Sequence, residues 1–269
     1  MKIYDRDYCQ LTKEENEEYM KMKEKEIIKR IGTRGLTFRK NLFHEYPKAA
    51  RHYEHLFPNY YLDILELKDI DTLNRKSEDF NELLANECKE QDILKFIKEK
   101  EAYFIIASIL KRNYHFGHHE AYIIPEFQLG TNYRADYLLI GRSSGGYEFV
   151  FVELESPKGN VIRRDGNLGE VFRKGIEQVN DWRRWLQRNY SALREIYKGH
   201  LKSGDQLPPE FIDYDNSRIH YVVIAGRRND FKELTYNIKR EYLHDQDILL
   251  LHYDNLIDFS IAIAGEATY

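Results

Sequence analysis

Three short apolar segments lie close together between residues 121 and 155, and they constrain the fold more than any other feature of the chain. These segments are AYIIPEFQLG (121–130), RADYLLIG (134–141) and YEFVFVELE (147–155). Each is rich in β-branched or aromatic residues and is bounded by turn-forming residues, a pattern typical of β-strands. The Ser-Ser-Gly-Gly stretch at 143–146 predicts a tight turn between the second and third segments. We therefore expect three antiparallel strands joined by hairpins.

Helical and strand patterns alternate on both sides of these segments. The expected elements are, in chain order, a helix at 78–87 capped by Ser77, a helix at 88–113, a helix at 168–190, a strand at 218–226, a helix at 229–244, a strand at 247–253 and a short terminal helix. A strand, a helix and a second strand in succession favour parallel pairing, because the chain must cross back over the sheet. The sequence therefore predicts an α/β fold with a mixed sheet.

Residues 1–76 lack this alternation, and we expect them to form a mainly helical N-terminal region, regulatory or oligomerising in role. The highly charged stretch at 13–31 predicts a solvated helix. Thr12 and Glu15 have the spacing of a capping box at its start. The remaining 77–269 would be a separate domain.

Composition excludes several classes of protein. The chain has 269 residues and two cysteines, Cys9 and Cys88, too few for a disulfide framework or a cysteine-based zinc site. The longest apolar runs, such as 104–110, are far shorter than the ~20 residues of a membrane span, and the N-terminus lacks an apolar signal segment. We expect a cytoplasmic protein without membrane attachment. Neither a Gly-rich phosphate-binding loop nor a Gly-x-Ser-x-Gly motif is present, which argues against an NTPase or a serine hydrolase.

Histidine pairs occur at two places. His52 and His55 stand three residues apart, a spacing that helical metal ligands use, but no third ligand is identifiable. His118 and His119 within HFGHHE (115–120) are adjacent, so a regular element would not easily direct both at one ion. We predict a metal site at neither place.

Acidic residues gather in the second and third predicted strands. Asp136 lies in the second, and Glu153 and Glu155 end the third. Residues two apart in a strand share a face, and a neighbouring strand can bring Asp136 beside the two glutamates. Three clustered carboxylates repel one another unless a cation binds, and Mg²⁺ or Mn²⁺ prefers such oxygen ligands. The pattern predicts a divalent-metal site.

The order of these elements and acids resembles the PD-(D/E)XK nuclease fold, a mixed α/β sheet of restriction-endonuclease-like type with the order αβββαβαβ here. More closely, residues 77–260 resemble the nuclease domain of Shedu antiphage defence proteins. The resemblance rests on the segments EQDILKFIKEKEAYF (90–104), IIPEFQLGTNYRADYLLIG (123–141), EFVFVELESP (148–157), GIEQVNDWRRWL (175–186), HYVVIAGRR (220–228) and LLHYDNLIDF (250–259).

This resemblance implies a metal-dependent endonuclease that hydrolyses phage or plasmid DNA in bacterial defence. Asp136 and Glu153 would ligate Mg²⁺ or Mn²⁺, with the Leu154 carbonyl as a third oxygen. Glu90 would be an outer metal ligand on the first helix. Gln178 would contact the phosphate or the attacking water. The resemblance also implies self-assembly into a homo-oligomer.

One position departs from the family pattern. The third-strand lysine of the PD-(D/E)XK motif is here Glu155, which would serve as a metal ligand or as the general base that activates water. Lys158 lies three residues further on and could reach back to the site. The alternative is a degenerate site, in which the domain binds nucleic acid or acts as a sensor or scaffold without cutting.

Basic residues follow the acidic cluster directly. The whole chain has a net charge of −4, which argues against binding nucleic acid through overall charge. Residues 156–198, however, contain ten basic and five acidic residues, a local net charge of +5. Lys158, Arg163 and Arg164 stand closest to the predicted site, and we expect them to contact DNA phosphates.

Overall fold

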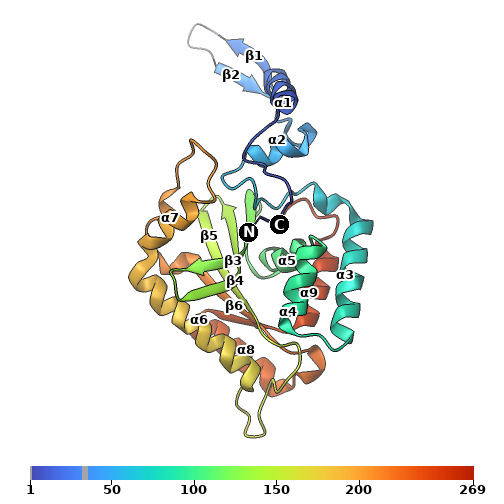
Figure 1. The fold of residues 1–269 in the computed structure, drawn as a ribbon, viewed down its shortest axis with the longest axis vertical. Helices are drawn as coiled ribbons and strands as arrows, with labels where there is room; N and C mark the ends of the chain where they lie inside the picture. The colour runs from blue at the N-terminus through green and yellow to red at the C-terminus, as the bar shows by residue number, and fades with distance from the viewer. Residues whose placement is uncertain (1, 32–35) are drawn as a thin grey trace.

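The fold is centred on a five-stranded mixed sheet with the order β3-β4-β5-β6-β7 (Figure 1). The computed structural model describes residues 2–31 and 36–269. The strands of the sheet are β3 (Glu120–Leu129), β4 (Tyr133–Ser143), β5 (Gly146–Leu154), β6 (Ile219–Ile224) and β7 (Ile248–Leu251). The first three pair antiparallel, and β6 and β7 extend the sheet in parallel. The predicted α/β fold with hairpin-linked strands and a parallel tail is confirmed.

Helices cover both faces of the sheet (Figure 1). They are α3 (Ile70–Ala85), α4 (Glu90–Glu99), α5 (Tyr103–Asn113), α6 (Glu170–Asn189), α7 (Leu193–Lys198), α8 (Glu233–Gln246) and α9 (Tyr253–Ile263). Because both faces are covered, the central strands are apolar along most of their length instead of alternating with polar residues. Among the described residues, no helix is both long and apolar enough to span a membrane.

The helix predicted at 78–87 begins earlier than expected. Helix α3 starts at Ile70, and its N-cap is Asp69, whose side chain accepts a hydrogen bond from the backbone of Thr72. The predicted cap, Ser77, is buried within the helix and donates to the carbonyl of Leu73 instead. Serine caps a helix only at its N-terminus, where backbone N–H groups lack partners within the helix. Ser77 lies in the helix interior, where these N–H groups already bond to the preceding turn.

The single helix predicted at 88–113 is two helices. Helix α4 ends at Glu99 and α5 begins at Tyr103. Glu101 between them has a φ of 46°, a left-handed conformation that no continuous α-helix can contain. Apolar residues recur at helical spacing on both sides of this break, because both helices bury apolar residues in the core. The sequence pattern therefore did not reveal the break.

The N-terminal region contains helices, as predicted, and also a hairpin that was not predicted. Helix α1 (Lys13–Lys25) has the expected capping box, in which Thr12 and Glu15 each accept from the other's backbone. The helix stops at Lys25, and β1 (Ile27–Ile31) then pairs antiparallel with β2 (Leu36–Arg39). Extending the predicted helix to residue 31 was therefore wrong. Helix α2 (Lys48–Tyr53) follows the hairpin, and α1 and the hairpin project from the body of the molecule (Figure 1).

Both ends of the chain lie against the main core (Figure 1). Ile3 and the C-terminal Tyr269 are buried and line the same cavity of about 190 Å³. Phe57 and Leu67 from the N-terminal region also belong to the hydrophobic core that surrounds the sheet. Lys76 lies in the middle of α3, so the chain has no break there. The division into units 1–76 and 77–269 stays a prediction.

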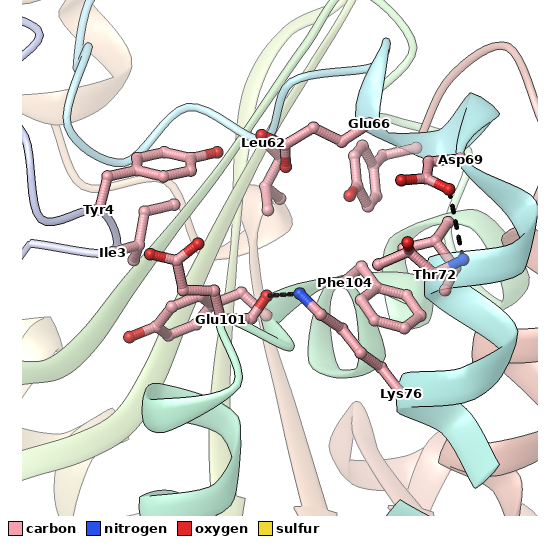
Figure 2. Close-up of a pocket in the computed structure, with 12 residues that line it drawn as sticks. Ile3, Tyr4, Leu62, Glu66, Asp69, Thr72, Lys76, Glu101 and Phe104 are labelled. Carbon is pink, nitrogen blue, oxygen red and sulfur yellow. Dashed lines mark hydrogen bonds between the residues drawn. The ribbon is translucent and has the colours of Figure 1, made fainter. Parts of the chain in front are cut away.

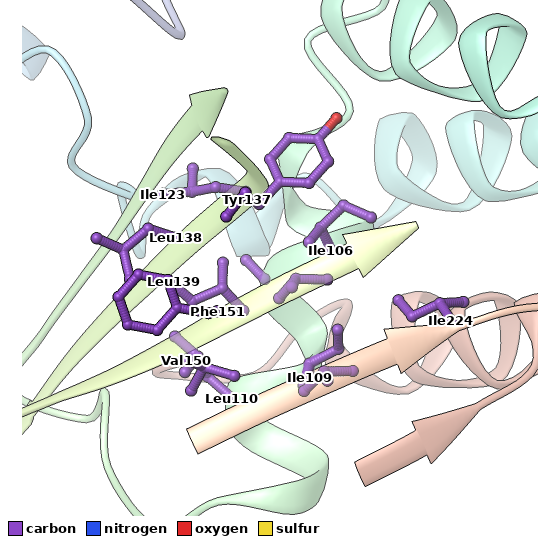
Figure 3. Close-up of a cluster of buried hydrophobic side chains, with 14 of the residues drawn as sticks. Ile106, Ile109, Leu110, Ile123, Tyr137, Leu138, Leu139, Val150, Phe151 and Ile224 are labelled. Atoms are coloured by element: carbon purple, nitrogen blue, oxygen red, sulfur yellow. The ribbon is translucent and has the colours of Figure 1, made fainter. Parts of the chain in front are cut away.

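Apolar side chains of α5 pack on one face of the sheet (Figure 3). Ile106, Ile109 and Leu110 gather there with Leu139 and Val150, which are cross-strand partners on β4 and β5. All five side chains are fully buried. This packing holds β4 and β5 firmly, and the residues at their adjoining ends are the predicted site.

Candidate metal site and nucleic-acid surface

Asp136 and Glu153 lie on the same face of the sheet. Tyr137 on β4 pairs with Val152 on β5, and continuing this antiparallel register by one residue places Asp136 opposite Glu153. Directly opposed residues on neighbouring strands point to the same side. The Oδ2 atom of Asp136 accepts a hydrogen bond from the backbone N–H of Leu154 at 2.7 Å. The aspartate is therefore oriented by the end of β5 itself.

Glu155 follows β5 and is held by backbone contacts on two sides. Its N–H donates to the carbonyl of Ile224 at 2.8 Å, which continues the parallel pairing of β5 with β6. Its carbonyl accepts from the hydroxyl of Tyr253 at 2.6 Å. The side chain is almost completely buried and shares a face with Glu153.

Helix α6 supplies the polar partners of both glutamates. Gln178 donates from Nε2 to Oε1 of Glu153, and the same nitrogen lies 3.4 Å from Oε1 of Glu155. Lys174 places its Nζ atom 2.8 Å from Oε2 of Glu155. Lys174 and Gln178 are four residues apart on one helix, so they face the sheet together.

A glycine allows α6 to approach the site this closely. A Cβ atom at Gly175 would lie 2.5 Å from Cγ1 of Val223 on β6 and 3.1 Å from Cγ of Glu155. Any larger residue at this position would push the helix off the sheet. The short distance between α6 and the strand acids therefore depends on the glycine at position 175.

Negative charge exceeds positive charge in this cluster. Burial raises the pKa of Glu153, and the negative charges of Asp136, Glu155 and Glu90 raise it further. Burial likewise raises the pKa of Asp136, with Glu90 adding to the effect and the backbone hydrogen bond opposing it. The pKa of Glu155 is also raised by burial, although Lys174 opposes the shift. Among the described residues, Lys174 alone forms an ion pair with these four acids, which include Glu90 at the start of α4, while the charge of Arg134 also lowers the pKa of Asp136.

The carboxylate oxygens of Asp136, Glu153 and Glu155 are ligands of the kind that a hard divalent cation prefers. The three carboxylates do not, however, lie close enough together to bind one ion. No set of three ligand atoms from Asp136, Glu153 and Glu155 lies within 4.8 Å of one another in the described chain. The carboxylates instead have protein partners: Leu154 binds Asp136, Lys174 binds Glu155, and Gln178 contacts both glutamates. A three-carboxylate metal site stays a prediction.

A different group of side chains has ligand atoms this close together. Within residues 2–31 and 36–269, the ligand atoms of His52, Asp63 and Glu66 all lie within 4.8 Å of one another. The sequence drew attention to His52 but paired it with His55, which instead stacks on Tyr61 with ring centroids 3.6 Å apart. No third ligand was identifiable from the sequence, because only the fold brings Asp63 and Glu66 from the following segment beside His52.

The predicted DNA-binding residues lie on the segment between β5 and α6. Lys158, Arg163 and Arg164 are all exposed, and Arg163 and Arg164 border a shallow groove. Arg163 pairs with Asp165 at 3.0 Å, and Lys158 lies 3.8 Å from Glu87. The side chains are free to meet a ligand from solvent, and their role in DNA binding stays a prediction.

The sequence pattern did not identify Lys174 as part of the site, because Lys174 stands out only as one of the basic residues that follow the acids. Its position four residues before Gln178 was the available signal, because that spacing puts both side chains on one helix face. The signal was weak without knowing which face of α6 meets the sheet.

The antiparallel strands β3–β5, the parallel strand β6 and the acids at the ends of β4 and β5 define an α/β protein with a restriction-endonuclease-like fold. The family model described as "Shedu protein SduA, C-terminal" matches residues 87–257, more than half of the chain. The chain therefore belongs to the Shedu family, a family of antiphage defence proteins. A search of curated proteins found no match.

Proposed function

We propose that this protein is a divalent-metal-dependent DNA endonuclease that acts in defence against phage. The observation that supports it best is the group of Asp136, Glu153 and Glu155 at the adjoining ends of β4 and β5, where both glutamates are buried and Asp136 is half-buried. Burying acids with too few positive partners costs stability, and a functional need for a cation accounts for it. Membership of the Shedu family adds the defence context.

Asp136 and Glu153 would hold Mg²⁺ or Mn²⁺, with Glu90 as an outer carboxylate and the Leu154 carbonyl as a further oxygen. The ion, when bound, supplies charge stabilisation and lowers the pKa of a water molecule. Gln178 orients Glu153 by its hydrogen bond and would contact the phosphate or the attacking water. The polar side chains of the site thus come from four elements, β4, β5, α4 and α6, that the hydrophobic core fixes relative to one another.

Lys174 compensates for the missing third-strand lysine. Glu155 stands at the position where the PD-(D/E)XK motif has lysine, and the ammonium group of Lys174 reaches it from α6 at 2.8 Å. Lys174 would stabilise negative charge on the scissile phosphate, while Glu155 would accept a proton from the attacking water. Positive charge therefore enters the site from the helix instead of the strand.

Cleavage of plasmid DNA tests the proposal directly. In the presence of Mg²⁺ or Mn²⁺, we expect the wild type to cut and Glu153→Gln to lose roughly 10³-fold or more in rate, about 4 kcal/mol of barrier. Glu177→Gln is a matched control, because Glu177 lies next to Gln178 but is exposed. Equal rates for Glu153→Gln and wild type would refute the assignment of the site.

The second candidate function is a nucleic-acid-binding or sensor module with a degenerate site. The glutamate at position 155 favours it, because the usual lysine is absent. Glu155→Lys separates the two candidates. In a working site the new lysine would face Lys174 and compete with the metal, so we expect activity to fall. Cleavage by Glu155→Lys, with none by wild type, would establish the binding module instead.

DNA binding through the β5–α6 segment is tested by salt dependence. Replacing Arg163 and Arg164 with Ala should weaken DNA binding and lower the slope of log K against log salt by roughly one to two units. Arg75→Ala, an exposed change on α3, should leave the slope unaltered. An unchanged slope in the double variant would place the DNA path elsewhere.

A further inference from the structure

A second group of potential metal ligands lies where the N-terminal region meets the core. His52 is on α2, and Asp63 and Glu66 follow in the segment that leads to α3. One ligand atom of each residue lies within 4.8 Å of the other two. His52 and Asp63 are fully buried, whereas the Glu66 side chain is 41% exposed. The group is separate from the strand acids of the proposed nuclease site.

The orientation of the His52 ring directs a nitrogen into this group. Its Nδ1 atom lies 2.9 Å from the carbonyl of Pro58, and since a carbonyl only accepts, Nδ1 carries the hydrogen. Nε2 is buried and has no hydrogen-bond partner in the described part of the chain. Tyr8 stacks on the ring at 4.2 Å, and Tyr61 packs against it edge-on. Metal-binding histidines are commonly fixed in this way, with the other ring nitrogen bound to a carbonyl.

The distance from His52 to Asp63 suits a shared ion better than a hydrogen bond. Nε2 lies 3.5 Å from Oδ2 of Asp63, longer than the usual 2.7–3.2 Å of an N–H···O bond. Two ligand atoms bound tetrahedrally at about 2.0–2.1 Å from one zinc ion stand about 3.4 Å apart. The buried nitrogen and the carboxylate therefore already have nearly the spacing of two ligands to one ion.

Both carboxylates also have basic partners, which does not prevent them from binding an ion. Arg51 contacts Oδ2 of Asp63 at 2.7 Å, and Lys48 contacts Oε1 of Glu66 at 2.6 Å. A carboxylate offers about four lone-pair sites, so one group can serve a basic side chain and a metal together. Such outer partners hold metal ligands in place in many proteins.

The cavity at the chain ends reaches one member of the group, Glu66. Glu66 lies on its wall beside Leu62 and Asp69, with Tyr4 across the opening (Figure 2). The cavity has a volume of about 190 Å³, larger than a hydrated ion needs when it loses some of its waters. An ion could therefore reach Glu66 from solvent without unfolding of α2.

We propose that His52, Asp63 and Glu66 bind a first-row transition-metal dication, with Zn²⁺ as the best match. One imidazole and two carboxylates favour such a metal, whereas Mg²⁺ prefers oxygen ligands alone. The bound ion ties α2 to the segment before α3. It thereby joins the projecting N-terminal region to the core and stabilises the protein.

Zinc binding by the chelator-treated full chain tests this proposal. The Glu153→Gln variant serves as the background, so that ions at the strand acids do not confuse the result. We expect about one Zn²⁺ per chain by elemental analysis, and a melting temperature about 5 °C higher with Zn²⁺ in hundredfold excess over its Kd. Mg²⁺ should not reproduce the increase.

Glu66→Gln is the informative variant, because Glu66 is partly exposed and its loss should not prevent folding. We expect it to lose at least tenfold in Zn²⁺ affinity and most of the thermal shift. Glu45→Gln is the matched control, an exposed glutamate whose partner is also a lysine, and should behave as the background does. Absence of bound Zn²⁺, or equal binding by Glu66→Gln, would overturn the proposal, whatever the outcome of the cleavage assay.

Discussion

Two groups of buried acids in this molecule show opposite electrostatic behaviour. At the ends of β4 and β5, burial raises the pKa of Glu153 and neighbouring acids raise it further. Burial also acts to raise the pKa of Asp63, but its hydrogen bonds and the positive charge of Arg51 lower that pKa well below its usual range. Glu120 resembles Asp63, because hydrogen bonds overcome burial and lower its pKa to about 2.

The difference between the two groups lies in their partners, since both are buried. Asp63 has an arginine bound to both of its oxygens. Among the described residues, Lys174 alone forms an ion pair with the four acids near β5, and the charge of Arg134 acts on Asp136 without such a pair. Acids with enough basic partners stabilise the fold. Acids without them destabilise it, which is expected of residues whose partner is a ligand. The same residue type thus has a structural role in one region and a proposed catalytic role in the other.

Asp63→Asn should produce the largest change in stability. It leaves the buried Arg51 without a charge partner, so we expect a loss of about 3–5 kcal/mol in the free energy of unfolding. Urea denaturation at pH 7 measures it. Asp79→Asn, which affects a more exposed pair with Lys100, should cost less than about 1 kcal/mol. Similar losses of stability in both variants would show that the buried pair of Asp63 with Arg51 contributes no more than an exposed ion pair.

Glu153→Gln should act in the opposite direction and stabilise the metal-free protein. Because the folded-state pKa of Glu153 is raised, the folded protein holds a proton that the unfolded chain releases above pH ~4.3. Stability therefore falls as the pH rises toward that raised pKa, by at most about 1.4 kcal/mol per pH unit. We expect Glu153→Gln to gain roughly 1–2 kcal/mol at pH 8 and little at pH 5. A gain that does not grow with pH would contradict this account.

Addition of Mg²⁺ or Mn²⁺ should relieve the same charge excess in the wild type. At ten times its Kd, an ion that binds only the folded protein stabilises it by about 1.4 kcal/mol. Thermal unfolding at pH 8 should show this increase in the wild type and less than half of it in Glu153→Gln. If both proteins respond equally, the ion binds away from the strand acids.

Lys174→Met should have the smallest effect. The ammonium group is the only basic partner of Glu155 in the described structure, but the Lys174 side chain is 59% exposed and solvent screens the pair. We expect a loss of roughly 0.5 kcal/mol at pH 8. A second change, Glu155→Gln, should restore the lost stability, because it removes the uncompensated acid. No rescue by the second change would show that Lys174 acts through packing and not through its charge.

The sheet and the facing of its acids could be predicted from the sequence. Strand residues alternate between two faces, and the tight turn at 143–146 sets the antiparallel register of β4 with β5, so the two together place Asp136 beside Glu153. Helix limits were less predictable. The breaks after Lys25 and Glu99 do not interrupt the local pattern, since apolar spacing reports which side of a segment is buried and not where a segment bends.

The sequence by itself determined the α/β class, the hairpin-linked strands and the pair of facing acids, because these follow from local patterns with a period of two or 3.6 residues. The partners of those acids were decided only by the tertiary structure. Lys174 meets Glu155 because Gly175 lets α6 approach the sheet, and Asp63 meets His52 because α2 folds against the segment that follows it. These contacts join residues 11 and 19 positions apart in the sequence, and they form because separate elements pack together. A short-range sequence pattern does not specify which side chains of two packed elements will touch.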